Sequence, residues 1–180
     1  MAISDQNLAK IAEKILKGSK FLQASSYKDY IAKTPQFSEN QTLVFRVKVF
    51  YDKRIYRDIE LTPEDTLEDV HLIIQKAFDF GYDHLYAFFL DNKRWSRHAE
   101  VGAQESSPEQ GTRKAHKVNL SHLILLPKQK FLYLFDFGDE WLFEVEFRGT
   151  CSREKGIKYP RIIKIQGNPP KQYGDENEEE

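Results

Sequence analysis

The segment from Lys130 to Arg148 constrains the fold more than any other part of the chain, because its apolar residues alternate with a period of two. Such alternation places one side of an extended strand in a core. Gly138 separates the two runs and predicts a short hairpin turn with a left-handed residue at that position. The residues expected on the inward face are Phe131, Tyr133, Phe135 and Phe137 in the first run, and Trp141, Phe143, Val145 and Phe147 in the second.

Four residues of this hairpin, Phe137, Gly138, Trp141 and Phe143, are predicted to be its structural anchors. Glu144 and Glu146 alternate with the inward residues of the second run, so we expect them to be solvated.

The composition indicates a cytoplasmic protein of one main domain. The chain has 180 residues and one cysteine, Cys151, which cannot form an internal disulfide bond. No apolar run approaches the ~20 residues that a membrane-spanning helix needs, so no membrane association is expected. The 27 basic and 28 acidic residues give a net charge of −1. That balance argues against a protein whose affinity comes from neutralising many phosphates.

A second hairpin is predicted before the aromatic one. Residues Leu43 to Tyr51 alternate, Asp52 and Lys53 form the turn, and Arg54 to Leu61 return. Arg57 falls on the inward face, which is unusual for a core strand. Either Arg57 lies at the end of the sheet with a carboxylate partner, or a β-bulge shifts the alternation.

The main helix is predicted from Thr66 to Phe80. Thr66 and Asp69 have the spacing of a capping box, in which each side chain accepts a hydrogen bond from the other residue's backbone amide. His71 lies at the edge of the apolar stripe, and Gly81 is the expected left-handed C-terminal residue. A strand from Asp83 to Leu90 should follow.

The remaining segments are shorter and less regular. We expect a short edge strand over 94–96, a surface loop over 100–111 and a strand through 162–165. Two short helices, over 5–16 and 26–32, predict an N-terminal extension that the core does not need in order to fold. Residues 171–180 read as an acidic disordered tail.

Three passages together resemble the plasmid pRiA4b ORF-3-like family: Asp136 to Trp141, the helix-to-strand passage over 69–88, and Tyr159 to Arg161. The resemblance spans roughly residues 43–170. It implies a compact, roll-like α+β core and genes carried on plasmids, mobile elements and chromosomes. This chain departs from the family's pattern in one place. Ile162 replaces a cysteine, and the segment from Asn168 to Gly174 replaces an acidic Pro-Pro-Glu-Asp run.

The predicted fold class is therefore α+β. An antiparallel or mixed sheet of about six strands, with two principal hairpins, should pack on one main helix and carry an N-terminal helical extension. The expected organisation is an extension over 1–40, the family domain over 41–170 and the tail over 171–180.

Candidate site residues form two sets. Carboxylates and imidazoles can bind a divalent metal if the fold brings them together, although the hairpin acids have an alternative role in accepting turn amides. Basic side chains after the third predicted strand could contact nucleic acid. The metal or ligand candidates are His71, His84, Asp136, Asp139 and Glu140. The nucleic-acid candidates are Arg94, Arg97, His98, Arg113, Lys114 and Lys117.

Three functions remain open from the sequence. The leading hypothesis is a non-enzymatic binding or regulatory module that accompanies mobile elements, with an unidentified protein or nucleic-acid partner and no cofactor. The first alternative is a divalent-metal-dependent, nuclease-like hydrolase that uses His84 with Asp136 and Asp139. The second alternative is a nucleic-acid-binding protein that uses the basic set.

Overall fold

The computed structural model describes residues 26–103 and 113–173, and within these ranges eight strands form one sheet in the order β5-β4-β3-β6-β7-β1-β2-β8. Neighbouring strands are antiparallel except for the parallel pair β4 and β5. The strands are β1 (Gln41–Val49), β2 (Tyr56–Leu61), β3 (Tyr86–Phe89), β4 (Glu100–Gly102), β5 (Arg113–Lys114), β6 (Lys130–Phe135), β7 (Trp141–Ser152) and β8 (Arg161–Gln166).

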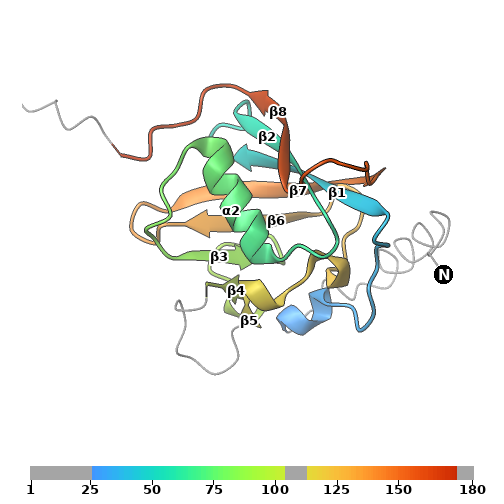
Figure 1. Ribbon diagram of the computed structural model, residues 1–180. Coiled ribbons are helices and arrows are strands. Elements are labelled where there is room, and N and C mark those ends of the chain that lie inside the picture. Colours follow the sequence, from blue (N-terminus) through green and yellow to red (C-terminus); the bar gives the residue numbers. More distant parts are fainter. Residues whose placement is uncertain (1–25, 104–112, 174–180) are drawn as a thin grey trace, which may run out of the picture.

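The helix α2 (Leu67–Phe78) lies across one face of this sheet (Figure 1). Its start matches the prediction, because Thr66 accepts from the backbone amide of Asp69 and the Asp69 carboxylate accepts from that of Thr66. Its end differs from the prediction. Asp79, not Gly81, has the left-handed conformation, with φ 58°. Asp tolerates this conformation because its short polar side chain can hydrogen-bond locally.

The main core lies between α2 and the sheet and confirms the predicted alternation of both hairpins. Each fully buried aromatic side chain removes enough apolar surface from water to contribute roughly 1.5–3 kcal/mol. The inward residues are Leu43, Phe45, Val47 and Val49 of β1, Phe131, Tyr133 and Phe135 of β6, and Phe143, Val145 and Phe147 of β7. Two predicted inward residues lie elsewhere: Tyr51 is exposed, and Phe137 packs against the opposite face of the sheet.

The opposite face is also covered, which the alternation does not predict. Ala87, Phe89, Leu132, Leu134 and Leu142 form a second buried apolar cluster there. This cluster explains why β3 and β6 are apolar on both sides and read as continuous apolar runs.

Glu144 and Glu146 lie on this second face and are buried, so their prediction as solvated residues is wrong. Lys130 Nζ lies 3.0 Å from Glu144 Oε1, and Lys48 Nζ lies 2.9 Å from Glu146 Oε2. Burial opposes ionisation of both acids, but hydrogen bonds from neighbouring lysine and arginine side chains hold their pKa values below the usual range. The residues are hidden because long basic side chains lie over them.

Arg57 is buried at 2% exposure, and its partners are backbone carbonyls rather than a carboxylate. Its guanidinium donates to Ala77 O at 2.8 Å and to Gln166 O at 2.9 Å, and lies over the ring of Phe78. The pairing of β2 with β8 does shift between Asp58 and the next residue. Arg57 therefore ties α2, β2 and β8 together through its several donors.

The sheet has more strands than the six expected, because β4 and β5 lie in or beside the segment predicted as a loop. These strands have three and two residues, too few for alternation to be visible in the sequence. The expected edge strand over 94–96 is instead a turn in which Trp95 has φ 60°.

The turn of the aromatic hairpin also differs from the prediction. The left-handed residues are Asp136, with φ 56°, and Glu140, with φ 52°, while Gly138 is not left-handed. The Asp136 side chain, just after β6, stabilises this turn by accepting hydrogen bonds from the backbone amides of Gly138 and Asp139.

The N-terminal arm, residues 26–40, is part of the core. A 3-10 helix, η2 (Tyr27–Tyr30), replaces the helix predicted over 26–32. Tyr30 and Phe37 are buried at 4% and 7% exposure, and the ring of Phe37 lies 5.8 Å from that of Phe147. Part of the extension is therefore packed into the core, whereas folding of the core without the extension stays a prediction. The helix predicted over 5–16 lies outside the described residues.

Residues 171–173 of the predicted tail are described, and side-chain hydrogen bonds attach Gln172 and Tyr173 to the domain. Gln172 accepts a hydrogen bond from the amide of Gly81 at 2.6 Å, and Tyr173 donates one to Asp83 at 3.0 Å. Residues 174–180 lie outside the described part. Among residues 26–103 and 113–173, no helix is long and apolar enough to cross a membrane.

Candidate functional site

The fold brings two of the metal candidates, His84 and Asp136, together at one end of β3 and β6. His84 Nε2 lies 3.4 Å from Asp136 Oδ2 and 3.6 Å from Asp83 Oδ2. It also lies 3.1 Å from the hydroxyl of Tyr173, which comes from the C-terminal segment. We call His84, Asp136, Asp83 and Tyr173 the acid–histidine cluster.

Every side chain of the acid–histidine cluster has partners within the cluster or the adjacent turn. The Tyr173 hydroxyl donates to Asp83, so it can only accept from His84, and this places the His84 proton on Nε2. Hydrogen bonds from its own backbone amide and from Tyr173 lower the pKa of Asp83. Asp136 Oδ1 accepts from the amides of Gly138 at 2.9 Å and Asp139 at 3.4 Å. The cluster therefore ties three segments of chain to one another.

The other metal candidates lie elsewhere. The Asp139 side chain is exposed, and Glu140 turns away to accept from Arg94 Nη1 at 2.8 Å and Trp95 Nε1 at 3.1 Å. In the described part of the chain, no group of three or more His, Cys, Asp or Glu residues is arranged to hold a metal ion. The predicted combination of His84, Asp136 and Asp139 is therefore not assembled as a ligand set.

His71 lies on α2 and is buried, rather than at the edge of the apolar stripe. Its Nδ1 lies 2.7 Å from the hydroxyl of Tyr133, which accepts a hydrogen bond from Gln75 Nε2, and its ring stacks on Tyr86 with centroids 3.8 Å apart. Burial lowers the pKa of His71 to about 4. A neutral imidazole is the form that this apolar site stabilises. Gln75 Oε1 and the Tyr86 hydroxyl are buried without a hydrogen-bond partner among the described residues.

The four predicted anchors lie in different surroundings. Phe143 is fully buried, whereas Trp141 is half-buried at the rim of the core, where its ring lies 5.0 Å from that of Phe80. Phe137 packs against Trp95 on the second face of the sheet, with ring centroids 5.3 Å apart. Gly138 occupies the turn that Asp136 caps.

The nucleic-acid candidates are distributed over several short elements, and two of them lie beside acidic side chains. Arg94 is paired with Glu140, and His98 Nε2 lies 3.4 Å from Asp91. Arg113 and Lys114 form β5, and Arg97 lies in the 3-10 helix η3 (Arg97–Ala99). Lys117, the last of the set, lies at the rim of a pocket.

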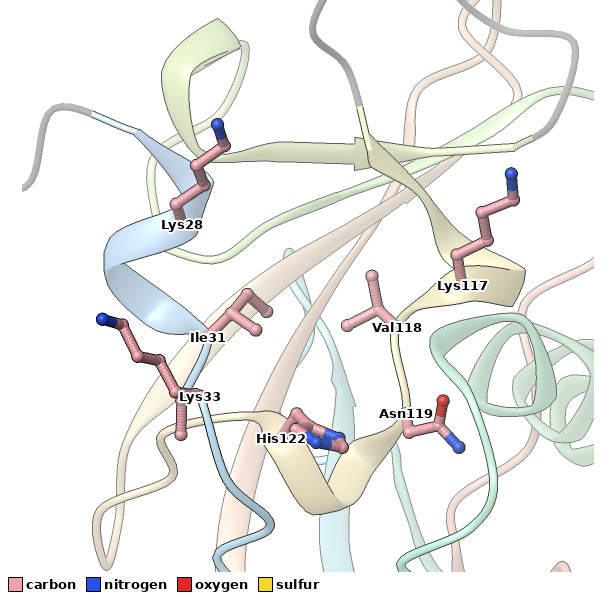
Figure 2. A pocket seen from close by; sticks show the side chains of 8 residues that line it. Lys28, Ile31, Lys33, Lys117, Val118, Asn119 and His122 are labelled. Carbon is pink, nitrogen blue, oxygen red and sulfur yellow. The ribbon is translucent and has the colours of Figure 1, made fainter.

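This pocket, which we call the lysine pocket, has a volume of about 470 Å³ and lies between the arm and the segment 117–122 (Figure 2). Ile31, Ala32 and Val118 supply apolar lining. No Asp or Glu among the described residues lines it. Its polar lining consists of Lys28, Lys33, Lys117, Asn119 and His122.

Hydrogen bonds to the backbone hold both walls of the lysine pocket. The amide of Ala32 donates to His122 O at 2.7 Å, and Ile31 pairs with Leu123 as an antiparallel bridge. On the other side, Asn119 Nδ2 donates to Glu64 O at 2.9 Å. The segment 117–122 is thus fixed between the arm and the loop before α2, so the pocket is largely formed without a ligand.

Sequence reasoning did not identify this pocket. Lys28 lies in the short helix η2 and Lys33 in the irregular segment after it, while Asn119 is the N-cap of η5 (Leu120–His122), which contains His122. The sequence does carry one signal: residues 113–127 contain no Asp or Glu. By themselves, the basic residues of this segment suggest only a basic loop. They are Arg113, Lys114, His116, Lys117 and His122.

Fold and site together define an α+β protein with a helix on one face of its sheet and a basic pocket at one side. The profile of the plasmid pRiA4b ORF-3-like protein family matches residues 41–178, which is most of the chain. The chain belongs to this family. No curated protein matches it.

The fold also occurs in a crystal structure of a protein of unknown function, MM3350, from Methanosarcina mazei Go1. The two chains are 22% identical, with a TM-score of 0.62 over 74% of this chain and 73% of that one. This similarity shows a shared fold. The family match begins at residue 41, so the arm side of the lysine pocket lies outside it.

Proposed function

We propose that this protein is a non-enzymatic binding module that takes an anionic ligand in the lysine pocket. One observation carries the proposal: three lysines are among the residues that line a pocket of about 470 Å³, and no Asp or Glu of the described residues lines it with them. Lysine side chains are mostly solvated singly or paired, so a concave group of them without acids favours an incoming negative charge.

The charges at the pocket supply enough interaction energy for specific binding. A hydrogen bond between an ammonium group and an anion contributes roughly 1.5–3 kcal/mol. Neither Lys28 nor Lys33 forms an ion pair with any residue that the structure describes. Their charges therefore do not have to be released from a partner within the described chain before an anion binds.

The hydrolase alternative lacks comparable support. His84 and Asp136 meet, but Nε2 of His84 carries a proton and faces the Tyr173 hydroxyl, and Asp136 caps a turn. The nucleic-acid alternative retains Lys117, which lines the lysine pocket. The family takes its name from an open reading frame of a plasmid, which supports a role as an accessory of mobile elements.

Thermal melting with inorganic tripolyphosphate tests the proposal. A ligand that binds only the folded state stabilises it by about 2.7 kcal/mol at a concentration of 100 Kd. We expect tripolyphosphate to raise the melting temperature of the wild type. The rise should be strongly reduced in the double variant Lys28→Gln with Lys33→Gln.

Lys158→Gln is the matched control, because it removes the same charge at an exposed position far along the chain from the pocket residues. It should respond to tripolyphosphate like the wild type. An equal response in all three proteins would show that the anion binds elsewhere, and no response in the wild type would also contradict the proposal.

A further inference from the structure

We infer that the outer edge of β8 pairs with β8 of a second copy of this chain, forming an antiparallel dimer with two-fold symmetry. This inference does not depend on the lysine pocket. β8 is the last strand of the sheet, beyond β2 (Figure 1), and in the described part of the chain β2 is its only partner strand. The outer side of β8 therefore presents main-chain donors and acceptors to which another strand can add.

The isoleucines of β8 are exposed to an unusual degree. The strand, RIIKIQ, contains three isoleucines and no proline or glycine. Ile163 is 45% exposed and Ile165 is 65% exposed, and the other exposed isoleucine of the described residues, Ile157, lies shortly before the strand. Isoleucine is among the residues that proteins bury most often. Its concentration at one edge of the sheet therefore indicates a contact surface.

The opposite edge of the sheet does not offer a comparable surface. There β5 consists of two basic residues, Arg113 and Lys114. Short and charged edge strands resist pairing with another chain. β8 is longer and carries apolar side chains, so it is the edge at which a second strand can gain both backbone hydrogen bonds and apolar contact.

The pairing of β8 with β2 shows on which face of the sheet its side chains lie. Ile165 lies opposite Arg57, on the face that α2 covers. Its neighbours Lys164 and Gln166 lie on the other face, because side chains alternate along a strand. Ile163 is the extra residue where the register shifts and has no opposite residue on β2. Regular pairing on the outer side therefore begins at Lys164.

One of the regularly paired residues suits a two-fold axis. In an antiparallel dimer such an axis, perpendicular to the sheet, sets one residue opposite its own copy. At Lys164 it would oppose two ammonium groups, which is destabilising. At Gln166 it would set Ile165 against Gly167. At Ile165 it pairs this side chain with the partner's Ile165, and Lys164 with the partner's Gln166, whose amide oxygen can accept from the ammonium group.

The pairing would be short, and this sets its strength. Three residue pairs join β3 to β4 within this sheet, so a pairing of that length is already used by the fold. Two separate chains must in addition offset the loss of translational and rotational freedom. We therefore expect a weak dimer whose population rises with protein concentration.

Sedimentation velocity over a wide range of concentration tests the inference. The wild type should pass from monomer to dimer as its concentration rises. Ile165→Asp should weaken the dimer at least about tenfold, because it sets two carboxylates opposite each other in place of an apolar pair. Ile157→Asp is the matched control, since it makes the same change at an exposed isoleucine outside the strand. This control should dimerise like the wild type.

Oxidative cross-linking locates the axis. Directly opposite residues of an antiparallel pair bring their Cβ atoms close enough for a disulfide bond. In a Cys151→Ser background, which removes the exposed native thiol, Ile165→Cys should give a covalent dimer. Ile163→Cys should not, although this position is exposed in the same strand, because the register places it well away from its own copy.

A wild type that stays monomeric at every concentration would overturn the inference and leave this edge to an extended segment of another protein. A dimer that Ile165→Asp does not weaken would place the interface elsewhere on the molecule. Equal cross-linking at the two cysteine positions would contradict the register and the two-fold pairing with it.

Discussion

The acid–histidine cluster and the lysine pocket are both polar and both join distant parts of the chain, but they differ in how their charges are satisfied. In the cluster, His84, Asp83, Asp136 and Tyr173 are partners of one another. In the pocket, Lys28 and Lys33 have no ion-pair partner among the described residues.

This difference separates a structural role from a binding role. Side chains that already satisfy one another gain little from a ligand, since binding would first break their existing hydrogen bonds. Side chains of like charge around a pocket gain most when an opposite charge arrives. On the proposed function, the residues that look most like an active site in the sequence serve mainly as scaffold, and the binding candidate lies where the sequence has no motif.

The largest expected effect tests whether the arm is a fixed wall of the pocket. Phe37→Ala should lower the free energy of unfolding by about 3 kcal/mol, because it leaves a cavity beside Phe147. Leu72→Ala is the control, since this side chain is 44% exposed on α2 and should change stability by no more than about 0.5 kcal/mol. Denaturant melts measure both. An unchanged midpoint for Phe37→Ala would mean that the arm does not dock.

His71 provides a third polar site, one that is buried and neutral, for comparison with the other two. Its pKa of about 4 lies below the ordinary value, so the unfolded chain binds a proton that the folded chain resists between pH 6.5 and 4. This residue's contribution to stability is therefore fully present above pH 6.5 and falls by roughly 3 kcal/mol as the pH drops to 4.

The variant His71→Gln should remove this part of the pH dependence. The measurement is the free energy of unfolding of both proteins between pH 7 and 4, because their difference cancels the titration of carboxylates. Parallel curves would show that His71 is protonated in the folded state as readily as in the unfolded one.

A smaller effect tests the structural role of the acid–histidine cluster. Asp136→Ala should cost about 1–3 kcal/mol, because two turn amides lose their acceptor at a left-handed residue. Asp139→Asn, at the exposed neighbour, should cost no more than about 1 kcal/mol. Melting temperatures of the wild type and Asp139→Asn should be the same with chelator and with excess manganese or magnesium. A metal-dependent rise in the wild type that disappears in Asp139→Asn would favour the hydrolase alternative instead.

The smallest effect concerns the lysine pocket without a ligand. The double variant Lys28→Gln with Lys33→Gln should have the stability of the wild type within about 0.5 kcal/mol, as expected for surface positions that make no ion pair. If the change is positive, relief of repulsion among like charges is its cause. A loss beyond about 1 kcal/mol, compared with Lys158→Gln, would mean that these ammonium groups already serve the fold and would weaken the contrast with the cluster.

The periodic parts of the fold were predictable from the sequence, for a local reason. Alternation of Phe131, Tyr133 and Phe135 with smaller residues predicts a strand, and Thr66 with Asp69 predicts the start of α2, because each pattern involves residues close in the chain. The short strands β4 and β5 and the left-handed residues Asp79 and Asp136 were not predictable in the same way. Their conformations depend on neighbours far along the chain.

Tertiary structure alone decided which polar residues meet. Glu144 and Glu146 alternate like solvated residues, but the basic side chains of β1 and β6 lie over them. His84 and Asp136 were recognisable as candidates, and only the fold showed that Tyr173 joins them. A polar side chain's role depends on the partners that packing brings to it.

By itself the sequence determined two hairpins, one capped helix and membership of a family, since periodicity and local order encode these directly. The lysine pocket was decided by the docking of an irregular arm against an irregular segment about 85–90 residues further along the chain, which brings Lys28 and Lys33 opposite Lys117. No local pattern marks such a meeting, because the hydrogen bonds that hold it are made by the backbone, which every residue possesses.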